Sequence, residues 1–256
     1  MCIRDRYICG GQRPNIIDKP TPFKETLLLA ESSMFGSSIA SYRNNPGKTY
    51  VKSLFHAAYR REVFEKVGFF NEELVRTEDN EIHYRMRKAG YKLCFDPDII
   101  SYQYTRSSLK AMLKQKYANG YWIGKTSKVC PKCLSIYHFV PFAFVSAIIA
   151  SGSVIGATGL AECIKKRHNH TLGKGISALR KVTVVLTTVM WVLYALMASG
   201  MAAVSAFKAE DKRNITNACL PVLFLLLHLS YGIGTIAGLM LSLIHISEPT
   251  RPISIS

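Results

Sequence analysis

Hydrophobic and polar positions divide this chain into two unlike parts. Over residues 7–136, short apolar groups alternate with charged residues, and this interval holds 21 Lys or Arg and 12 Asp or Glu. It is followed by three runs without charge, 137–160, 182–207 and 218–240, of 24, 26 and 23 residues. A helix needs about 20 apolar residues to cross the hydrocarbon core of a bilayer. The pattern therefore predicts a soluble domain followed by a membrane region.

Short helices and strands are predicted to alternate within the soluble part. Strands are expected at 7–9, 53–59, 93–95 and 99–104, and helices at 24–40, 61–67, 78–89 and 107–125. Gly68 and Gly90 follow two of these helices, where the C-terminal cap favours glycine, and Ser107 or Ser108 is placed to cap the last one. Helices that alternate with strands indicate an α/β layer fold.

The charges of the connections bear on how the membrane region is oriented. Segment 161–181 carries six Lys or Arg and one acidic residue, Glu162, whereas 208–217 is nearly balanced. Positive-inside bias therefore places 161–181 in the cytoplasm, where the basic domain is also expected. The basic domain and 161–181 can both lie in the cytoplasm only if 137–160, rich in Ser and Gly, is re-entrant or interfacial, or if the positive-inside bias fails. We expect 137–160 to be re-entrant or interfacial.

Composition excludes several classes of protein. A chain with 48% hydrophobic residues is too apolar for a disordered tail, and its seven cysteines, without a visible secretory signal, are expected to be reduced. The net charge of +16 could suggest nucleic acid, but no nucleic-acid-binding module accompanies it. Basic residues beside apolar spans have a simpler explanation in membrane lipids. We therefore expect no nucleic-acid partner.

Two short motifs could suggest a metal site. Cys130 and Cys133 form one Cys-x-x-Cys pair, but zinc usually takes four ligands and no second pair lies at a useful spacing. The pair is predicted to be two free thiols. Asp96-Pro97-Asp98 has the letters of an Asp-x-Asp motif, yet its position between two predicted strands favours a turn.

The two ends of the chain are related through their coding DNA. A codon choice for Met1-Cys2-Ile3-Arg4-Asp5-Arg6 has a reverse complement that encodes Leu241-Ser242-Leu243-Ile244-His245 and begins Ile246. This relation suggests one inverted element on both sides of an insert, resembling the transposon end used in sequencing-library preparation. We therefore expect 1–6 and 241–256 to be adapter-like artefacts, and 7–240 to be a piece of a longer protein.

The acidic pair Glu78-Asp79 is the main candidate for chemistry. It stands at the start of a predicted helix, where the helix dipole and free backbone N–H groups favour acidic side chains. That structural role is one interpretation. The other is a carboxylate at a pocket rim that acts as a general base toward an acceptor hydroxyl.

A set of motifs around this pair carries a family resemblance. The motifs are Tyr59-Arg60-Arg61, Gly68-Phe69-Phe70-Asn71-Glu72, Glu78-Asp79, and Arg85 and Arg87 with Gly90. Their order and spacing resemble the second half of a family 2 glycosyltransferase domain. The continuation through Arg106-Ser107-Ser108-Leu109, Gln115-Lys116-Tyr117 and Gly120-Tyr121-Trp122, and a segment from His228 to Tyr231, are similar to the membrane-attached exopolysaccharide branch, the succinoglycan-type glucosyltransferases.

This resemblance implies the C-terminal part of a GT-A fold (7–136) followed by transmembrane helices (137–240). It implies an enzyme that uses a nucleotide-diphosphate sugar and inverts the anomeric carbon, with Asp79 as the base and Glu78 orienting the acceptor or tuning Asp79. The family's Asp-x-Asp motif would lie upstream, so Mg²⁺ or Mn²⁺ is expected in the intact parent. This piece alone is expected to bind no metal and to be inactive.

Five further residues are candidates for substrate binding, namely His56, Arg60, Gln115, Tyr117 and Trp122. For His56 a packing role in a strand competes with substrate contact. The basic helix 107–128 has two possible roles. It could anchor the domain on anionic lipid, or its residues Gln115, Tyr117 and Trp122 could close over the acceptor. The Gln-x-x-Arg-Trp motif of processive synthases is not reproduced, which argues against a cellulose- or hyaluronan-like enzyme.

The resulting functional hypothesis is hexosyl transfer to a lipid-linked saccharide during exopolysaccharide or cell-surface polysaccharide synthesis. The protein would lie in a bacterial inner membrane with its catalytic domain in the cytoplasm. Two alternatives remain open, a polyprenyl-phosphate sugar transferase and a non-catalytic basic membrane scaffold.

Overall fold

The computed structural model describes residues 6–36, 47–167, 174–209 and 214–244. The predicted artefact segments therefore lie largely outside the described residues, and so do positions 37–40 of the predicted helix 24–40. The last helix continues through Ile244, past the predicted boundary at 240.

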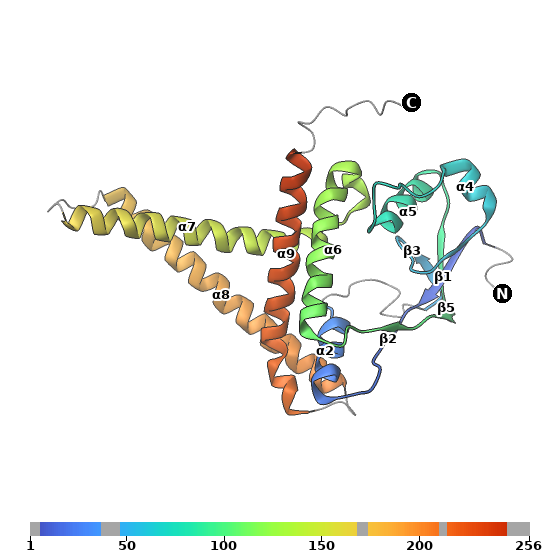
Figure 1. The fold of residues 1–256 in the computed structure, drawn as a ribbon, viewed down its shortest axis with the longest axis horizontal. Coiled ribbons are helices and arrows are strands. Elements are labelled where there is room, and N and C mark those ends of the chain that lie inside the picture. Colours follow the sequence, from blue (N-terminus) through green and yellow to red (C-terminus); the bar gives the residue numbers. More distant parts are fainter. Residues whose placement is uncertain (1–5, 37–46, 168–173, 210–213, 245–256) are drawn as a thin grey trace, which may run out of the picture.

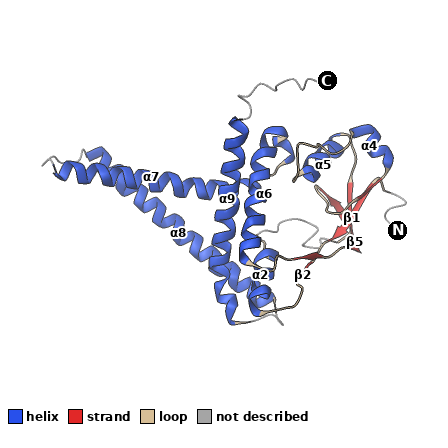
Figure 2. Ribbon diagram, viewed as in Figure 1, coloured by secondary structure: helices blue, strands red, loops and turns tan. Residues whose placement is uncertain are grey.

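The soluble part is built from short strands and helices in alternation. The strands are β1 (Ile8–Gln12), β2 (Asn15–Ile16), β3 (Thr49–Val51), β4 (Ala58–Tyr59), β5 (Leu93–Ile100) and β6 (Gln103–Tyr104). The helices are α2 (Pro22–Ser32), α4 (Arg61–Val67), α5 (Glu78–Lys88) and α6 (Leu109–Val129). This confirms the mixed α/β fold, and Figure 2 shows the strands gathered at one end of the molecule.

One sheet of four strands, in the order β3-β5-β1-β4, organises this end. The two central strands, β1 and β5, run parallel, with Ile8 opposite Leu93. At the two edges, β3 pairs antiparallel with β5, and β4 pairs antiparallel with β1. Helices α4 and α5 cover a core that includes Ile8, Val63, Ile82 and Phe95, all fully buried. The β2–β6 pair leads from this sheet toward the helical layer.

Two strand predictions need correction. The predicted strand 53–59 exists only as β4, because the preceding segment is a loop in which His56 has a positive φ of 49°. The predicted turn at Asp96-Pro97-Asp98 lies inside the single strand β5, and the register against β1 shifts there instead of the chain reversing.

Three long apolar helices follow the soluble part. Two short 3₁₀ segments, η1 (Pro131–Cys133) and η2 (Ile136–Phe139), lead into α7 (Val140–Arg167), α8 (Lys174–Lys208) comes next, and η4 (Ile215–Cys219) precedes α9 (Leu220–Ile244). Among the described residues, three segments are long and apolar enough to cross a bilayer, and they indicate a membrane protein: Ile136–Ile164, Lys174–Lys208 and Ile215–Leu241. α7 is uninterrupted, which contradicts the re-entrant form of the expectation for 137–160 but does not test the interfacial form.

A second core joins these helices to the soluble part. Leu27 of α2, Met112 of α6, Ala198 of α8 and Phe224 of α9 are buried together. α9 lies alongside α6, α7 and the beginning of α8 project together away from that pair, and the end of α8 returns to pack against α9 and α2 (Figure 1). The molecule therefore has a sheet core and a helical core, and the candidate site lies between them.

Candidate functional site

The site begins at the first turn of α5. Thr77 takes the N-cap position in the left-handed conformation, with φ of 67° and ψ of 6°, and its side chain does not cap the helix. Glu78 and Asp79 follow in the first turn, where the free backbone N–H groups favour negative charge. The sharp change of direction at Thr77 places both carboxylates at the edge of the domain that faces the helical layer.

The loop before α5 is attached to α6 by two side-chain contacts. The Arg76 guanidinium donates a hydrogen bond to Asn119 Oδ1 at 2.8 Å, and the hydroxyl groups of Thr77 and Thr126 form a short hydrogen bond. Asn119 and Thr126 both belong to α6. The position of the acidic pair is therefore coupled to that of α6.

Asp79 has the electrostatic properties of a base. Burial, the largest effect, and the charge of Glu78 raise the pKa of its carboxyl from 3.8 to a net value of about 6. A 2.8 Å hydrogen bond from the backbone N–H of Asn80 and the charge of Arg13 act in the opposite direction. Near neutral pH this carboxylate is ionised and retains an affinity for a proton, which general-base catalysis requires.

Glu78 differs from its neighbour. Its Oε2 atom is buried and has no hydrogen-bond partner among the described residues. A buried carboxylate oxygen without a partner is costly, and such atoms are common where a ligand completes the site.

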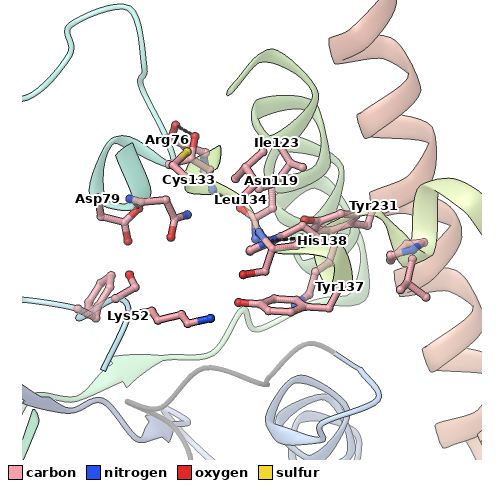
Figure 3. A pocket seen from close by; sticks show the side chains of 18 of the residues that line it. Lys52, Arg76, Asp79, Asn119, Ile123, Cys133, Leu134, Tyr137, His138 and Tyr231 are labelled. Carbon is pink, nitrogen blue, oxygen red and sulfur yellow. Dashed lines mark hydrogen bonds between the residues drawn. The ribbon is translucent and has the colours of Figure 1, made fainter. Parts of the chain in front are cut away.

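A cavity of about 940 Å³ adjoins both carboxylates. Figure 3 shows Asp79 and Lys52 facing it from the soluble domain, with Tyr137, His138 and Tyr231 on the opposite side. Its wall is polar and charged near α5 and becomes apolar toward the long helices, where it includes Phe35, Val140, Met197 and Leu227. The cavity could therefore hold an amphiphilic molecule with its polar end at Asp79.

A buried histidine supports the wall behind the carboxylates. His83 Nε2 is 2.8 Å from Tyr59 Oη, and its Nδ1 is 3.2 Å from the hydroxyl of Ser53, which lines the cavity. Burial, followed by the charge of Arg87, lowers the pKa of His83 to about 4. The pKa of Tyr59 is raised, by burial and then by the charge of Asp79. His83 is thus neutral and links two residues around Asp79.

Of the seven residues predicted for the site, the structure brings Glu78 and Asp79 to the cavity. His56 and Arg60 do not line it. His56 is exposed in the β3–β4 loop and stacks beside Phe55, while Arg60 lies over the Tyr7 ring and 3.5 Å from Glu62.

Gln115, Tyr117 and Trp122 of α6 also lie outside the cavity wall. Gln115 accepts a hydrogen bond from Arg106, Tyr117 is 40% exposed, and Trp122 packs edge-on against Tyr121. A different face of α6 lines the cavity, with Lys116, Asn119 and Ile123. The spacing of these three residues, i, i+3 and i+7, is the signal by which the sequence could have identified that face.

The sequence motifs do not identify Lys52, Ser53, Arg76 or His83. Lys52 and Ser53 follow directly after the short strand β3, at a sheet edge that only the strand order brings close to α5. The positive charge of Lys52 and Arg76 in the wall suits an anionic ligand.

The described residues do not fit a metal site. Among them, no three His, Cys, Asp or Glu side chains converge. Asp96 lies in strand β5, 3.3 Å from Lys48, and accepts a hydrogen bond from the backbone N–H of Asp98 in the same strand. Cys133 lines the cavity as a free thiol, and burial, with a smaller effect of Cys130, raises its pKa to about 12.

Comparison with known proteins defines the class to which this fold and cavity belong. The family model described as "Glycosyl transferase family group 2" matches residues 10–244, and the chain belongs to this family. The resemblance inferred from the sequence motifs is thereby confirmed. Members with this GT-A type of domain commonly use a divalent metal.

Two characterised relatives are similar to parts of the chain. The succinoglycan biosynthesis protein ExoA of Rhizobium meliloti is 28% identical over 98 residues, which cover 38% of this chain and 30% of the relative. The O-antigen chain rhamnosyltransferase WbaN of Salmonella anatum is 33% identical over 88 residues, covering 34% of this chain and 28% of the relative. The chain thus matches under a third of either relative's length. No solved structure matches it significantly.

Proposed function

We propose that the intact protein is an inverting glycosyltransferase that acts in polysaccharide biosynthesis. It would move a sugar from a nucleotide-diphosphate donor to a hydroxyl group of a lipid-linked saccharide. The observation that carries this proposal is Asp79, a carboxylate with a raised pKa at the polar end of a cavity whose other end is apolar.

In this mechanism Asp79 accepts the proton of the acceptor hydroxyl. The hydroxyl oxygen attacks the anomeric carbon of the donor sugar, the bond from that carbon to the diphosphate breaks, and the nucleoside diphosphate leaves. A single in-line displacement inverts the anomeric carbon. Glu78 would orient the acceptor through its buried oxygen. Since no three-ligand cluster occurs among the described residues, no step is assigned to a metal.

The cavity also supports a membrane-bound acceptor. Residues from α7, α8 and α9 form its apolar end, so the saccharide part of a lipid-linked acceptor could reach Asp79 while its lipid stays near the long helices. Anionic groups of donor or acceptor would meet Lys52 and Arg76. We infer that the protein lies in a bacterial inner membrane, with the catalytic domain on the cytoplasmic side where nucleotide sugars occur.

Replacement of the base tests this proposal. In the full-length protein, we expect Asp79→Asn to lower kcat by about 10²–10⁴-fold with little change in KM, because a positioned general base contributes that much to the rate. Asp98→Asn is the matched control, since Asp98 is an exposed carboxylate of strand β5. Radiolabelled sugar transfer to membrane lipid extracts measures both variants.

Two outcomes would contradict the proposal. A loss of only a few-fold in Asp79→Asn would favour a polyprenyl-phosphate sugar transferase, whose phosphate acceptor needs no base. Absence of transfer in the wild-type protein with every nucleotide sugar would favour the non-catalytic scaffold.

A further inference from the structure

The helix α9 is attached to the soluble part along its length, unlike the other two candidate spans. Gly234 and Gly238 lie directly against the backbone of Tyr117 and Tyr121 in α6, so that an added Cβ at either glycine would fall 2.1 Å from a carbonyl oxygen. The hydroxyl of Ser230 donates a 2.7 Å hydrogen bond to the carbonyl of Leu113 in α6. These contacts hold α6 and α9 together as one unit.

The segment η4 and the first part of α9, which follows it, have equally close contacts with α2 and the turn after it. In η4, the hydroxyl of Thr216 donates to the carbonyl of Pro22 at 3.0 Å, and Asn217 Oδ1 accepts from Thr26 at 2.8 Å. Further along, His228 Nε2 is 2.7 Å from the carbonyl oxygen of Phe35. Accordingly, 39% of the apolar window of this helix is buried within the protein, against 6% for each of the other two.

The partner helix α6 cannot lie in the hydrocarbon core. One of its faces carries lysines and tyrosines in a stripe, Lys110, Lys114, Tyr117, Tyr121, Lys125 and Lys128, most of them exposed. This stripe extends from Lys110 to Lys128, about 27 Å along the helix, which is shorter than the core of a bilayer, about 30 Å. If α6 crossed the core, these lysines would lie at several depths within it. Lysine and tyrosine together are typical of the headgroup region.

The helices α7 and α8 are placed differently. α7 meets α9 near its own beginning, where Gly232 lies against Pro141 and Val145, and it then leads away from α9. Near the far end, Arg180 forms an ion pair with Glu162, which joins α8 to α7. Figure 1 shows α9 between α6 and the projecting α7–α8 hairpin, and α7 runs across the direction of α9.

We propose that the chain crosses the bilayer twice, through α7 and α8, and that α9 lies along the membrane surface beside α6. If α7 crosses the bilayer along its length, α8 crosses it at a tilt, and α9, which runs across α7, lies along the membrane surface (Figure 1). The exposed apolar residues Val222, Ile233 and Met240, which share one face of α9, contact lipid, and the lysine–tyrosine stripe of α6 lies at the headgroups. The partner of this α6–α9 surface is the lipid bilayer itself.

This arrangement assigns a side of the membrane to each connection. The end of α8 and the end of α9 lie on the same side as the soluble domain, and the end of α7 and the beginning of α8 lie on the opposite side. Loop charge alone placed the basic segment 161–181 on the side of the domain. That placement would require α9 to cross the bilayer. Because α9 is packed on α6, a crossing α9 would carry the lysines of α6 into the hydrocarbon core.

Topology and depth measurements test the proposal without any assay of activity. Reporters at the N-terminus and after Ile244 are expected on the same side of the membrane. A cysteine in place of Gly175, exposed at the beginning of α8, is expected to be labelled only from the opposite side. A C-terminal reporter on the side opposite to the N-terminal one would overturn the proposal. So would labelling of the cysteine at position 175 from the side of the soluble domain.

Depth is measured with spin labels on exposed positions of two helices. In vesicles of phosphatidylethanolamine and phosphatidylglycerol, labels at Val222, Ile233 and Met240 of α9 are expected at similar, shallow depths. Labels at Val185, Val192 and Leu196 of α8, also exposed, are the matched comparison and are expected at depths that change steadily along the helix. A label at Ile233 much deeper than those at both Val222 and Met240 would contradict the surface position of α9.

Discussion

At the scale of single residues, Asp79 combines two properties that oppose each other. Its position at the start of a helix favours the carboxylate, whereas burial beside Glu78 favours the neutral acid. Burial has the larger effect, so the folded protein binds a proton at this residue more tightly than the unfolded chain does. The ionised Asp79 carboxylate therefore lowers the stability of the folded protein at neutral pH, and the same burial gives it a higher affinity for a proton.

A stability measurement can detect this cost. The pKa of Asp79 rises from 3.8 to about 6 on folding, so ionised Asp79 destabilises the fold above pH 6, and the penalty disappears as the pH falls through that value toward 3.8. Asp79→Asn should raise the thermal midpoint at pH 8 by an amount equivalent to at most about 3 kcal/mol, less to the extent that solvent reaches the cavity. The gain should vanish near pH 4.

The control for this prediction is Asp98→Asn, at an exposed position of β5. The thermal midpoints of both variants are measured in detergent as a function of pH. An identical pH dependence would show that burial does not destabilise the Asp79 carboxylate. Since asparagine retains an oxygen for the Asn80 N–H group, the substitution changes charge more than hydrogen bonding.

At the scale of the elements, the contact between α6 and α9 depends on glycine. Gly120 and Gly124 of α6 and Gly234 and Gly238 of α9 form two small-xxx-small pairs that allow the backbones to approach closely. This contact determines which face of α6 is left to line the cavity. The register of two helices thus selects Lys116, Asn119 and Ile123 as wall residues.

Substitution of one glycine tests that contact. In Gly120→Ala the new Cβ would lie 2.0 Å from the carbonyl oxygen of Tyr231, so the helices must separate. We expect a loss of about 1–3 kcal/mol, as for other overpacked sites, measured as a lower thermal midpoint in detergent. Gly156→Ala in α7 is the control, since nothing lies within 4 Å of its added Cβ. An equal midpoint in the two variants would refute the role given to Gly120.

The sequence predicted the long helices better than the cavity. Uncharged runs located α7, α8 and α9, but α8 begins at Lys174 and not near 182, because lysine and arginine are good helix formers and charge does not end a helix. The motif around Asp79 located the acidic pair. His56, Arg60 and Gln115 are polar residues within or beside the family motifs, yet membership of a motif does not determine the face on which a side chain lies.

At the scale of the whole molecule, two cores share one cavity. The sheet core positions α5 and its carboxylates, and the helical core positions the opposite wall through α6 and α9. Arg76 and Thr77 connect the two cores through their contacts with Asn119 and Thr126. A change in the packing of the long helices is thereby transmitted to the acidic pair.

The exposed apolar surface of α7 and α8 leads to a prediction about extraction. Side chains such as Leu160, Leu186 and Leu196 are more than 60% exposed, and only lipid or detergent can cover so many of them. We expect the protein to stay in the membrane pellet through washes with high salt and alkaline carbonate, and to dissolve in mild detergent. Release by salt would mean that the lysines of α6, and not the hairpin, hold it on the membrane.

The shared wall of the cavity also limits how this protein can be engineered. A tempting way to obtain a water-soluble form is to cut the chain just before α6 and discard everything that follows. Such a truncation would retain Glu78 and Asp79 but remove Asn119, Tyr137 and Tyr231 from the far side of the binding space. The carboxylates would then face open solvent, so soluble variants should instead keep α6 and α9 and shorten only the projecting hairpin.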